Sequence, residues 1–172
     1  MKELILGGVR SGKSRLAEQH AHASGCEVFY IATATADDAE MQQRIAHHRR
    51  QRPSTWPLIE EPLKLATTLQ QYAARDRCLL VDCLTLWLTN LLLADDAFRL
   101  AQERDALIEQ LPGLPGHIIL VSNETGMGIV PEGKLARRFG DEAGRLHQDL
   151  AQICDRVILT VAGLPQVLKG DL

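Results

Sequence analysis

The sequence has no large excess of charge of either sign. Its 172 residues include 19 lysines and arginines against 22 acidic residues, which gives a formal net charge of −3. A chain that binds nucleic acid or an anionic membrane over a broad surface usually carries a strong positive charge. We therefore expect no nucleic-acid partner, and any recognition of a polyanion must be local.

Paired cysteines and long apolar runs are also missing. None of the four cysteines, Cys26, Cys78, Cys83 and Cys154, stands in a CxxC pair or in a Cys/His cluster with zinc spacing. The N-terminal apolar run is too short for a signal peptide, and polar residues interrupt the apolar stretch 79–94. The sequence therefore predicts free thiols, no transmembrane segment and a cytoplasmic location.

Short apolar runs alternate with longer segments of helical periodicity. Continuously apolar runs are typical of strands in a sheet that helices cover on both faces. The predicted strands are 4–7, 28–33, 78–82, 117–122 and 156–161. The predicted helices are 13–24, 37–50, 62–74, 84–93, 98–111 and 131–154. This alternation predicts an α/β fold with a mostly parallel sheet, in a single domain that covers residues 1–172.

The segment 131–154 has the clearest helical pattern. Pro131 suits a first helical turn, and apolar residues then recur every three or four positions. These residues are Leu135, Phe139, Ala143, Leu146, Leu150 and Ile153. We expect this stripe to pack against the core.

The first predicted strand runs directly into GGVRSGKS, residues 7–14. The pattern GxxxxGK(S/T) is typical of a phosphate-binding loop when a strand precedes it and a helix follows it. Its glycines let backbone N–H groups turn toward phosphate oxygens, and the helix N-terminus favours an anion. Lys13 is expected to reach the β and γ phosphates, and the Ser14 hydroxyl to bind Mg²⁺. The predicted nucleotide-binding residues here are Gly7, Gly8, Val9, Arg10, Ser11, Gly12, Lys13 and Ser14.

A phosphate loop usually works with an acid at the end of another buried strand. Asp82 ends the apolar run 78–82. Such a residue can also serve only as a cap for the next helix. Because the same chain carries a phosphate loop, we favour a role for Asp82 in holding Mg²⁺, directly or through water.

A phosphate loop fits several classes of protein. The Asn-Lys-x-Asp motif with which GTPase switches read guanine does not occur in the sequence. A small-metabolite kinase fits the size of the chain, and a non-catalytic nucleotide-binding switch also stays open. A further class must explain the stretch RIAHHRRQRP, residues 44–53, which holds two histidines and four arginines.

The two histidines of this stretch differ in their place on the predicted helix. At about 100° per residue, His48 falls on the apolar stripe of Met41 and Ile45, whereas His47 falls among polar residues. An imidazole nitrogen can attack a nucleotide α-phosphate and hold a nucleotidyl group, and neighbouring arginines can neutralise the phosphate charge. Helical histidines are more often structural or solvated, so catalysis by His47 is a hypothesis from the residues alone.

Taken together, these motifs resemble the bifunctional adenosylcobinamide kinase/adenosylcobinamide-phosphate guanylyltransferase family of cobalamin biosynthesis. The segments that carry the resemblance are GGVRSGKSRLAE (7–18), YIATA (30–34), DDAEMQQRIAHHRRQRP (37–53), LLVDCLTLWLTNLL (79–92) and SNETGMGIVPEGKLARRFGDEAGRLHQ (122–148). The phosphate loop alone is unspecific, but its combination with HHRRQRP and NETGMGIVP is highly specific.

The resemblance implies a RecA-like P-loop domain, a homotrimer and two reactions. In the first reaction, ATP or GTP phosphorylates adenosylcobinamide. In the second, GMP passes from GTP to that phosphate and gives adenosylcobinamide-GDP and pyrophosphate. The second reaction passes through a guanylylated histidine, a role that falls on His47 in this sequence.

The resemblance also assigns further residues to the nucleotide site. They are Ala32, Thr33, Ala34, Arg49, Arg50, Gln51, Arg52, Glu60 and Asp82. Glu61 is an equally acidic neighbour of Glu60, so either carboxylate fits that position. Asn123 and Glu124 stay open between contacts to corrinoid or metal and a local role in capping the 131–154 helix or shaping its turn.

Overall fold

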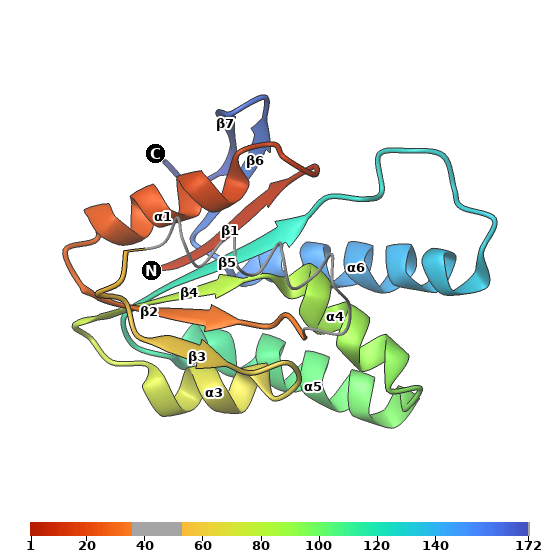
Figure 1. The fold of residues 1–172 in the computed structure, drawn as a ribbon, viewed down its shortest axis with the longest axis horizontal. Coiled ribbons are helices and arrows are strands. Elements are labelled where there is room, and N and C mark those ends of the chain that lie inside the picture. The colour runs from red at the N-terminus through yellow and green to blue at the C-terminus, as the bar shows by residue number, and fades with distance from the viewer. Residues whose placement is uncertain (36–52, 172) are drawn as a thin grey trace.

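A computed structural model describes residues 1–35 and 53–171 of the chain. These residues form one seven-stranded sheet with the order β3-β2-β4-β5-β1-β6-β7 (Figure 1). The strands are β1 (Lys2–Gly7), β2 (Glu27–Ala32), β3 (Leu58–Glu60), β4 (Arg77–Asp82), β5 (His117–Asn123), β6 (Arg156–Val161) and β7 (Leu164–Lys169). Neighbouring strands are parallel except β6 and β7, which run antiparallel. The prediction of an α/β fold with a mostly parallel sheet is confirmed.

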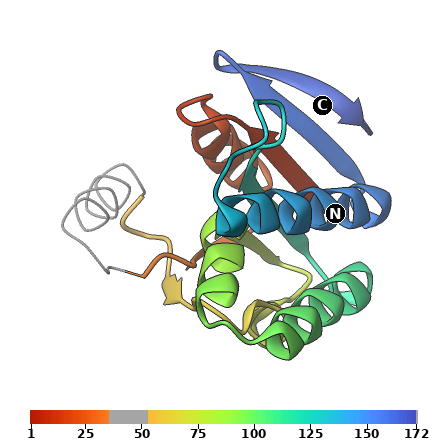
Figure 2. The same ribbon diagram turned by 90° about the vertical axis from the view of Figure 1, so that its right-hand side faces the viewer.

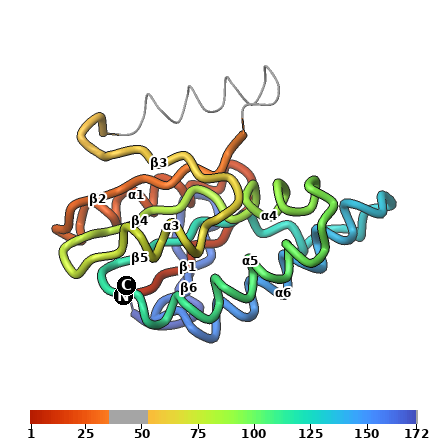
Figure 3. The backbone as a smooth tube through the Cα atoms, turned by 90° about the horizontal axis from the view of Figure 1, so that it is seen from below, coloured from red at the N-terminus to blue at the C-terminus, as the bar shows by residue number. Residues whose placement is uncertain are grey.

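Helices cover both faces of this sheet (Figures 1 and 2). One face carries α1 (Lys13–Ala23). The other carries α3 (Leu65–Tyr72), α4 (Leu84–Leu93), α5 (Ala97–Gln110), the short helix η1 (Leu111–Gly113) and α6 (Lys134–Ile153), with α5 and α6 side by side (Figure 3). Residues of β1 alternate between the two cores, because successive side chains of a strand point to opposite faces. Leu4 and Leu6 join the larger core, and Ile5 joins the α1 core.

The strands β3 and β7 were not predicted from the sequence. Strand β3 has only three residues, and β7 is largely exposed at the edge of the sheet. An exposed edge strand needs no continuous apolar run, and Pro165 is tolerated there. The predicted helices 62–74 and 98–111 are α3 and α5 with shorter or shifted ends. The predicted helix 37–50 lies entirely outside the described residues.

Helix α6 begins later than the sequence suggests. Its first residue is Lys134 and its N-cap is Gly133, so the prediction that Pro131 lies in the first helical turn is wrong. Residues 124–133 arch away from the sheet before α6 returns along it (Figure 1). The predicted stripe therefore meets the core only further along the helix: Leu146 is 1% exposed, whereas Leu135 is 51% exposed.

All four cysteines are free, as predicted. Within residues 1–35 and 53–171, no helix combines the length and the apolar character that a membrane span requires.

Candidate active site

The loop after β1 has the backbone that a phosphate loop requires. Strand β1 ends at Gly7, and α1 begins at Lys13. A Cβ atom on Gly7 would lie 2.4 Å from Ser11 Oγ and 2.6 Å from the Thr160 carbonyl oxygen, so no side chain fits there. Gly12, the N-cap of α1, has φ +96°, which residues with a side chain rarely adopt. The strand, loop and helix context of the motif is confirmed.

The turn between β6 and β7 supports this loop from the side. Gly163 N donates to Ser11 O over 2.8 Å, and a Cβ on Gly12 would lie 3.1 Å from Gly163 Cα. Ala162 and Gly163 both have positive φ, 53° and 81°, as in a two-residue hairpin turn. Sequence reasoning missed this support. Ala162 and Gly163 give only a weak signal for a hairpin, because Asn-Gly, Asp-Gly and Gly-Gly are the pairs typical of such turns.

Lys13, the first residue of α1, lies near Asp82, the last residue of β4. Lys13 Nζ donates to the Gly8 carbonyl oxygen over 3.2 Å. Burial lowers the pKa of Lys13, and the charge of nearby Asp82 opposes that shift. Asp82 Oδ2 accepts a hydrogen bond from the Tyr30 hydroxyl over 2.9 Å. Because the N-cap of the next helix is Cys83, Asp82 is not its cap, and the alternative of a mere capping role is wrong.

The oxygen donors at this edge fit Mg²⁺ in the presence of a nucleotide. Ser14, in the first turn of α1, offers a hydroxyl and Asp82 a carboxylate, both of the hard oxygen type that Mg²⁺ prefers. In the part of the chain that the structure describes, no group of three His, Cys, Asp or Glu side chains could hold a metal by itself. This is compatible with Mg²⁺, which usually takes one or two protein ligands and completes its shell with water and phosphate oxygens.

The predicted residues at the end of β2 lie beside Asp82. Ala32 pairs with Asp82 on one side and with Glu60 on the other. Thr33 is fully buried, and its hydroxyl donates to Cys83 O over 2.6 Å and accepts from Cys83 N over 3.1 Å. The Thr33 side chain thus links the ends of β2 and β4. A nucleotide contact at this point is therefore expected from the backbone and from Ala34.

The choice between Glu60 and Glu61 is clearer in the structure than in the sequence. Glu61 Oε1 accepts from the backbone N–H groups of Leu63 and Lys64, over 2.9 and 2.8 Å. Glu61 therefore holds the turn before α3. Glu60 is exposed at the end of β3, which favours Glu60 for the predicted nucleotide contact.

The remaining predicted residues fall outside the described ranges. They are His47, Arg49, Arg50, Gln51 and Arg52. Their roles stay predictions.

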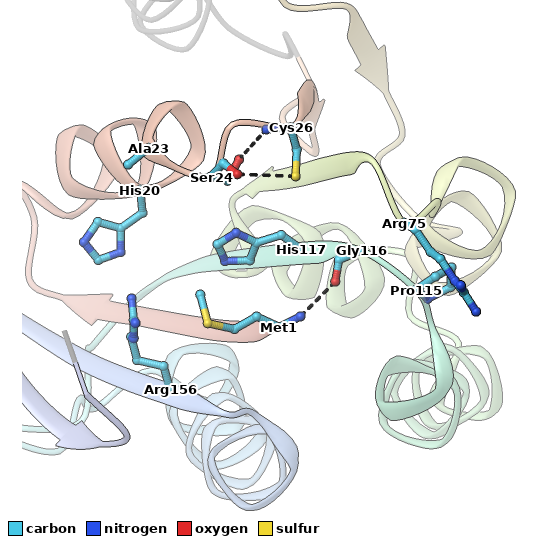
Figure 4. Close-up of a pocket in the computed structure, with 10 residues that line it drawn as sticks. All are labelled: Met1, His20, Ala23, Ser24, Cys26, Arg75, Pro115, Gly116, His117 and Arg156. Atoms are coloured by element: carbon cyan, nitrogen blue, oxygen red, sulfur yellow. Dashed lines mark hydrogen bonds between the residues drawn. The ribbon is translucent and has the colours of Figure 1, made fainter.

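A cavity of about 900 Å³ lies at the opposite, amino edge of the sheet (Figure 4). Its lining includes His20, His117 and Arg156, which surround the fully buried carboxylate of Glu3. His20 Nδ1 lies 2.6 Å from Glu3 Oε1, and His117 Nε2 and Arg156 Nη1 lie 3.4 and 3.8 Å from Oε2. Burial alone would raise the pKa of Glu3, but these neighbours hold it below its ordinary value. The basic groups thus neutralise a buried charge, and we assign the cluster a structural role.

The family of the chain follows from comparison with known proteins. Residues 3–168 match the family described as cobinamide kinase / cobinamide phosphate guanyltransferase. The chain belongs to this family. It is 65% identical over 171 residues to the bifunctional adenosylcobalamin biosynthesis protein CobP of Pseudomonas aeruginosa, covering 99% of each chain. It is 41% identical over 182 residues to the bifunctional adenosylcobalamin biosynthesis protein CobU of Salmonella typhimurium, covering 98% of this chain and 100% of the relative.

Membership confirms the predicted class of enzyme. The chain is a bifunctional kinase and guanylyltransferase of cobalamin biosynthesis. The alternatives of a kinase without guanylyl transfer and of a non-catalytic switch do not fit this family.

Solved structures support the fold alone. The flagellar accessory protein FlaH from Methanocaldococcus jannaschii superposes with a TM-score of 0.52 at 15% identity, over 99% of this chain and 78% of that chain. An ATPase from the type III secretion system of pathogenic bacteria superposes with a TM-score of 0.54 at 16% identity, over 96% of this chain and 56% of that one. The predicted RecA-like P-loop fold is confirmed.

Proposed function

We propose that both reactions start from a nucleoside triphosphate held by residues 7–14, and that GMP transfer passes through a phosphoramidate on His47. ATP or GTP serves the phosphorylation of adenosylcobinamide, and GTP serves the guanylyl transfer. The observation that carries this proposal is the phosphate loop with Lys13 close to Asp82, in a chain of this family.

In the kinase step, the acceptor hydroxyl attacks the γ-phosphorus, and the bond from that phosphorus to the β–γ bridging oxygen breaks. Catalysis of such a transfer consists mostly of positioning and charge neutralisation. Lys13 and the backbone N–H groups of the loop hold the β and γ phosphates. Ser14 and Asp82 would hold Mg²⁺, which when bound supplies further positive charge to those phosphates.

In the guanylyl step, a nitrogen of His47 attacks the α-phosphorus of GTP. The bond from that phosphorus to the α–β bridging oxygen breaks, and pyrophosphate leaves with this oxygen. The phosphate of adenosylcobinamide phosphate then attacks the same phosphorus, and the N–P bond breaks to free His47. Arg49, Arg50 and Arg52 follow His47 in the sequence and are proposed to neutralise the phosphates during this transfer.

The two reactions need different atoms in line, the γ-phosphorus in one and the α-phosphorus in the other. We therefore propose that the segment carrying His47 moves between the steps or that a second nucleotide site exists. A nucleotide complex with His47 already within bonding distance of the α-phosphorus, and unchanged from the free enzyme, would argue against movement.

The proposal includes a homotrimer, as the family resemblance implies, and a cytoplasmic location. Exposed apolar side chains at Met127, Ile129 and Val130 support a surface that another subunit could cover. Four free cysteines support a reducing compartment.

The histidine intermediate can be tested with GTP labelled at the α-phosphate and Mg²⁺. The wild-type protein should retain label that is labile in acid and stable in alkali, as a phosphoramidate is. His47→Ala should abolish the label, whereas the matched control His48→Ala should keep it. Label that persists in His47→Ala and disappears in His48→Ala would overturn the assignment.

A further inference from the structure

A row of polar contacts leads from the carboxyl end of β5 to α6. Asn123 N donates to Thr85 Oγ1 over 2.7 Å, and Thr85 Oγ1 lies 3.4 Å from Ser122 Oγ. Ser122 Oγ lies 2.8 Å from His147 Nε2. On the other side of the same ring, His147 Nδ1 lies 3.7 Å from Glu124 Oε2. Groups from α4, β5, α6 and the β5–α6 connection are thus linked around the buried imidazole of His147.

The hydrogens of this row can all point toward Glu124. A backbone N–H can only donate, so Thr85 Oγ1 accepts from Asn123 and its own hydrogen is free for Ser122. The Ser122 hydroxyl then donates to His147 Nε2, which leaves the ring hydrogen on Nδ1, facing the Glu124 carboxylate. Burial lowers the pKa of His147, against the effect of Glu124, which favours the neutral ring that this arrangement needs.

This row contains the residue types of a hydrolase triad, namely Ser122, His147 and Glu124. In a hydrolase the substrate reaches the serine, whereas here the accessible member is the acid. Ser122 is only 2% exposed, so no substrate can reach its hydroxyl. The Glu124 side chain is 20% exposed and is the member of the three that a ligand can reach. The geometry therefore points to Glu124 as the reacting group and to His147 as its support.

Glu124 lies directly beside the phosphate loop. Its backbone N–H donates to the Gly7 carbonyl oxygen over 3.0 Å, and the preceding Asn123 pairs with Gly7 across β5 and β1. Its Oε1 accepts from Gly126 N, and a carboxylate has further lone pairs for a ligand hydroxyl. Asp82, a second acid at this edge, already accepts from Tyr30 and is close to Lys13, which suits a metal or phosphate role better.

We infer that Glu124 accepts the proton of the acceptor hydroxyl in the kinase reaction, and that His147 is the positioning residue that orients its carboxylate. As the oxygen–phosphorus bond forms and the nucleoside diphosphate leaves, the hydroxyl proton passes to a Glu124 oxygen and from there to solvent. The 3.7 Å contact with His147 is long for a hydrogen bond, as catalytic contacts often are before substrate binds. This inference rests on the proposed use of the loop 7–14 for the kinase step.

Glu124→Gln tests the catalytic role and keeps the side-chain shape. General-base catalysis is typically worth about 10²–10⁴-fold, so kcat for phosphorylation of adenosylcobinamide should fall by about 10²-fold or more. The equilibrium affinity for GTP and the labelling of the protein by GTP should stay within about twofold, because neither uses the acceptor hydroxyl. Glu132→Gln, an exposed glutamate on the same connection, is the matched control and should change none of the three measurements.

Two substitutions separate positioning by His147 from simple packing. An Asn amide nitrogen can replace the Nδ1–H that faces Glu124, whereas a Gln amide reaches the Nε2 position near Ser122. If His147 positions Glu124, His147→Asn should retain at least tenfold more kinase kcat than His147→Gln, with similar KM for nucleotide. A merely structural role predicts that kcat follows thermal stability in both variants.

The inference is overturned if Glu124→Gln keeps kinase kcat within about threefold of wild type, or if the two His147 variants lose activity only in proportion to stability. These outcomes differ from a failure of the proposed function. If the loop 7–14 does not hold the nucleotide, Gly7→Ala will keep wild-type affinity for GTP, a measurement that contains no corrinoid and leaves the Glu124 and His147 side chains unchanged.

Discussion

The two edges of the sheet use ionisable side chains in opposite ways. At the amino edge, the Glu3 carboxylate is completely buried, and basic side chains from α1, β5 and β6 surround it. At the carboxyl edge, Lys13, Asp82 and Glu124 each contact a neighbour but stay partly exposed. The charge at the amino edge is compensated within the fold, whereas the charged groups at the carboxyl edge can still bind a ligand. The cavity of about 900 Å³ lies at the first edge, so the presence of a cavity alone is a poor guide to the active site here.

Backbone with positive φ occurs at both edges of the sheet. The phosphate loop contains Arg10 and Gly12 at φ values of 57° and +96°, a region that is unfavourable for most residues. The start of β1 at the amino edge is a regular strand with β5 and β6 on either side. Gly25 and Gly116, just before β2 and β5 at the amino edge, also have positive φ, 68° and 78°. Positive φ alone therefore does not separate the two edges; what distinguishes the phosphate loop is that its N–H groups must face phosphate.

The largest effect on folding is expected from Glu3→Gln. This change removes the charge that His117 and Arg156 face and leaves those basic groups in a partly buried site. Breaking a buried ion pair typically costs about 3–5 kcal/mol, so the free energy of unfolding in urea should fall by about 3 kcal/mol. Kinase kcat of the folded fraction should stay within about twofold, because the change is at the edge away from the phosphate loop.

Glu27→Gln is the matched control for this experiment. Glu27 pairs with Arg77 at 3.4 Å, but its side chain is 57% exposed, and exposed pairs contribute only about 0–1 kcal/mol. An equal loss of stability in both variants, or a large loss of kcat in Glu3→Gln, would contradict the division between the two edges.

The second-largest effect on stability is expected from Gly7→Ala, with Gly8→Ala, the adjacent glycine of the phosphate loop, as the comparison. A Cβ on Gly7 would clash with Ser11 and with the Thr160 carbonyl, whereas a Cβ on Gly8 meets no atom within 4 Å. Overpacking typically costs about 1–3 kcal/mol, so Gly7→Ala should lower the free energy of unfolding by about 2 kcal/mol and weaken GTP binding at least tenfold. Gly8→Ala should leave the stability nearly unchanged. Urea unfolding measures the stability of each variant, and equilibrium binding measures its affinity for GTP. Equal stability and equal affinity of the two variants would refute the steric argument.

The sequence predicted the central strands and the phosphate-loop motif, but not the contacts from other elements that hold them in place. Five apolar runs and the motif at 7–14 were sufficient to predict the parallel sheet and the strand–loop–helix unit around the motif, because buried strands and phosphate loops leave strong local patterns. The β6–β7 turn that holds Ser11 has no such pattern, since β7 is exposed. The bond from Tyr30 to Asp82 joins residues 52 positions apart and depends on strand order, which local periodicity does not contain.

The same limit applies to the two histidine clusters. Nothing in the spacing of Glu3, His20 and His117 indicates that they meet, since they lie on β1, α1 and β5. His147 lies within the predicted stripe segment of α6, but its contact with Ser122 depends on how α6 crosses the sheet. Residues outside the described ranges, His47 above all, are known here from sequence pattern and family alone.

The smallest expected effect is a difference between the two edges in how folding stability depends on pH. The pKa of His147 is lowered from 6.5 by burial, so the unfolded chain binds a proton more readily and stability falls as the pH drops below about 6.5. The pKa of Glu3 is also lowered, from 4.5, so its contribution is present above about pH 4.5 and is lost as the pH falls further. One proton changes stability by at most about 1.4 kcal/mol per pH unit. Urea unfolding from pH 7.5 to 3.5 tests both effects. The wild-type minus His147→Gln difference in stability should begin to shrink as the pH falls below about 6.5, whereas the wild-type minus Glu3→Gln difference should shrink only below about pH 4.5. If both differences shrink over one common range, the two clusters do not titrate as separate units, and the contrast between a compensated edge and a functional edge is lost.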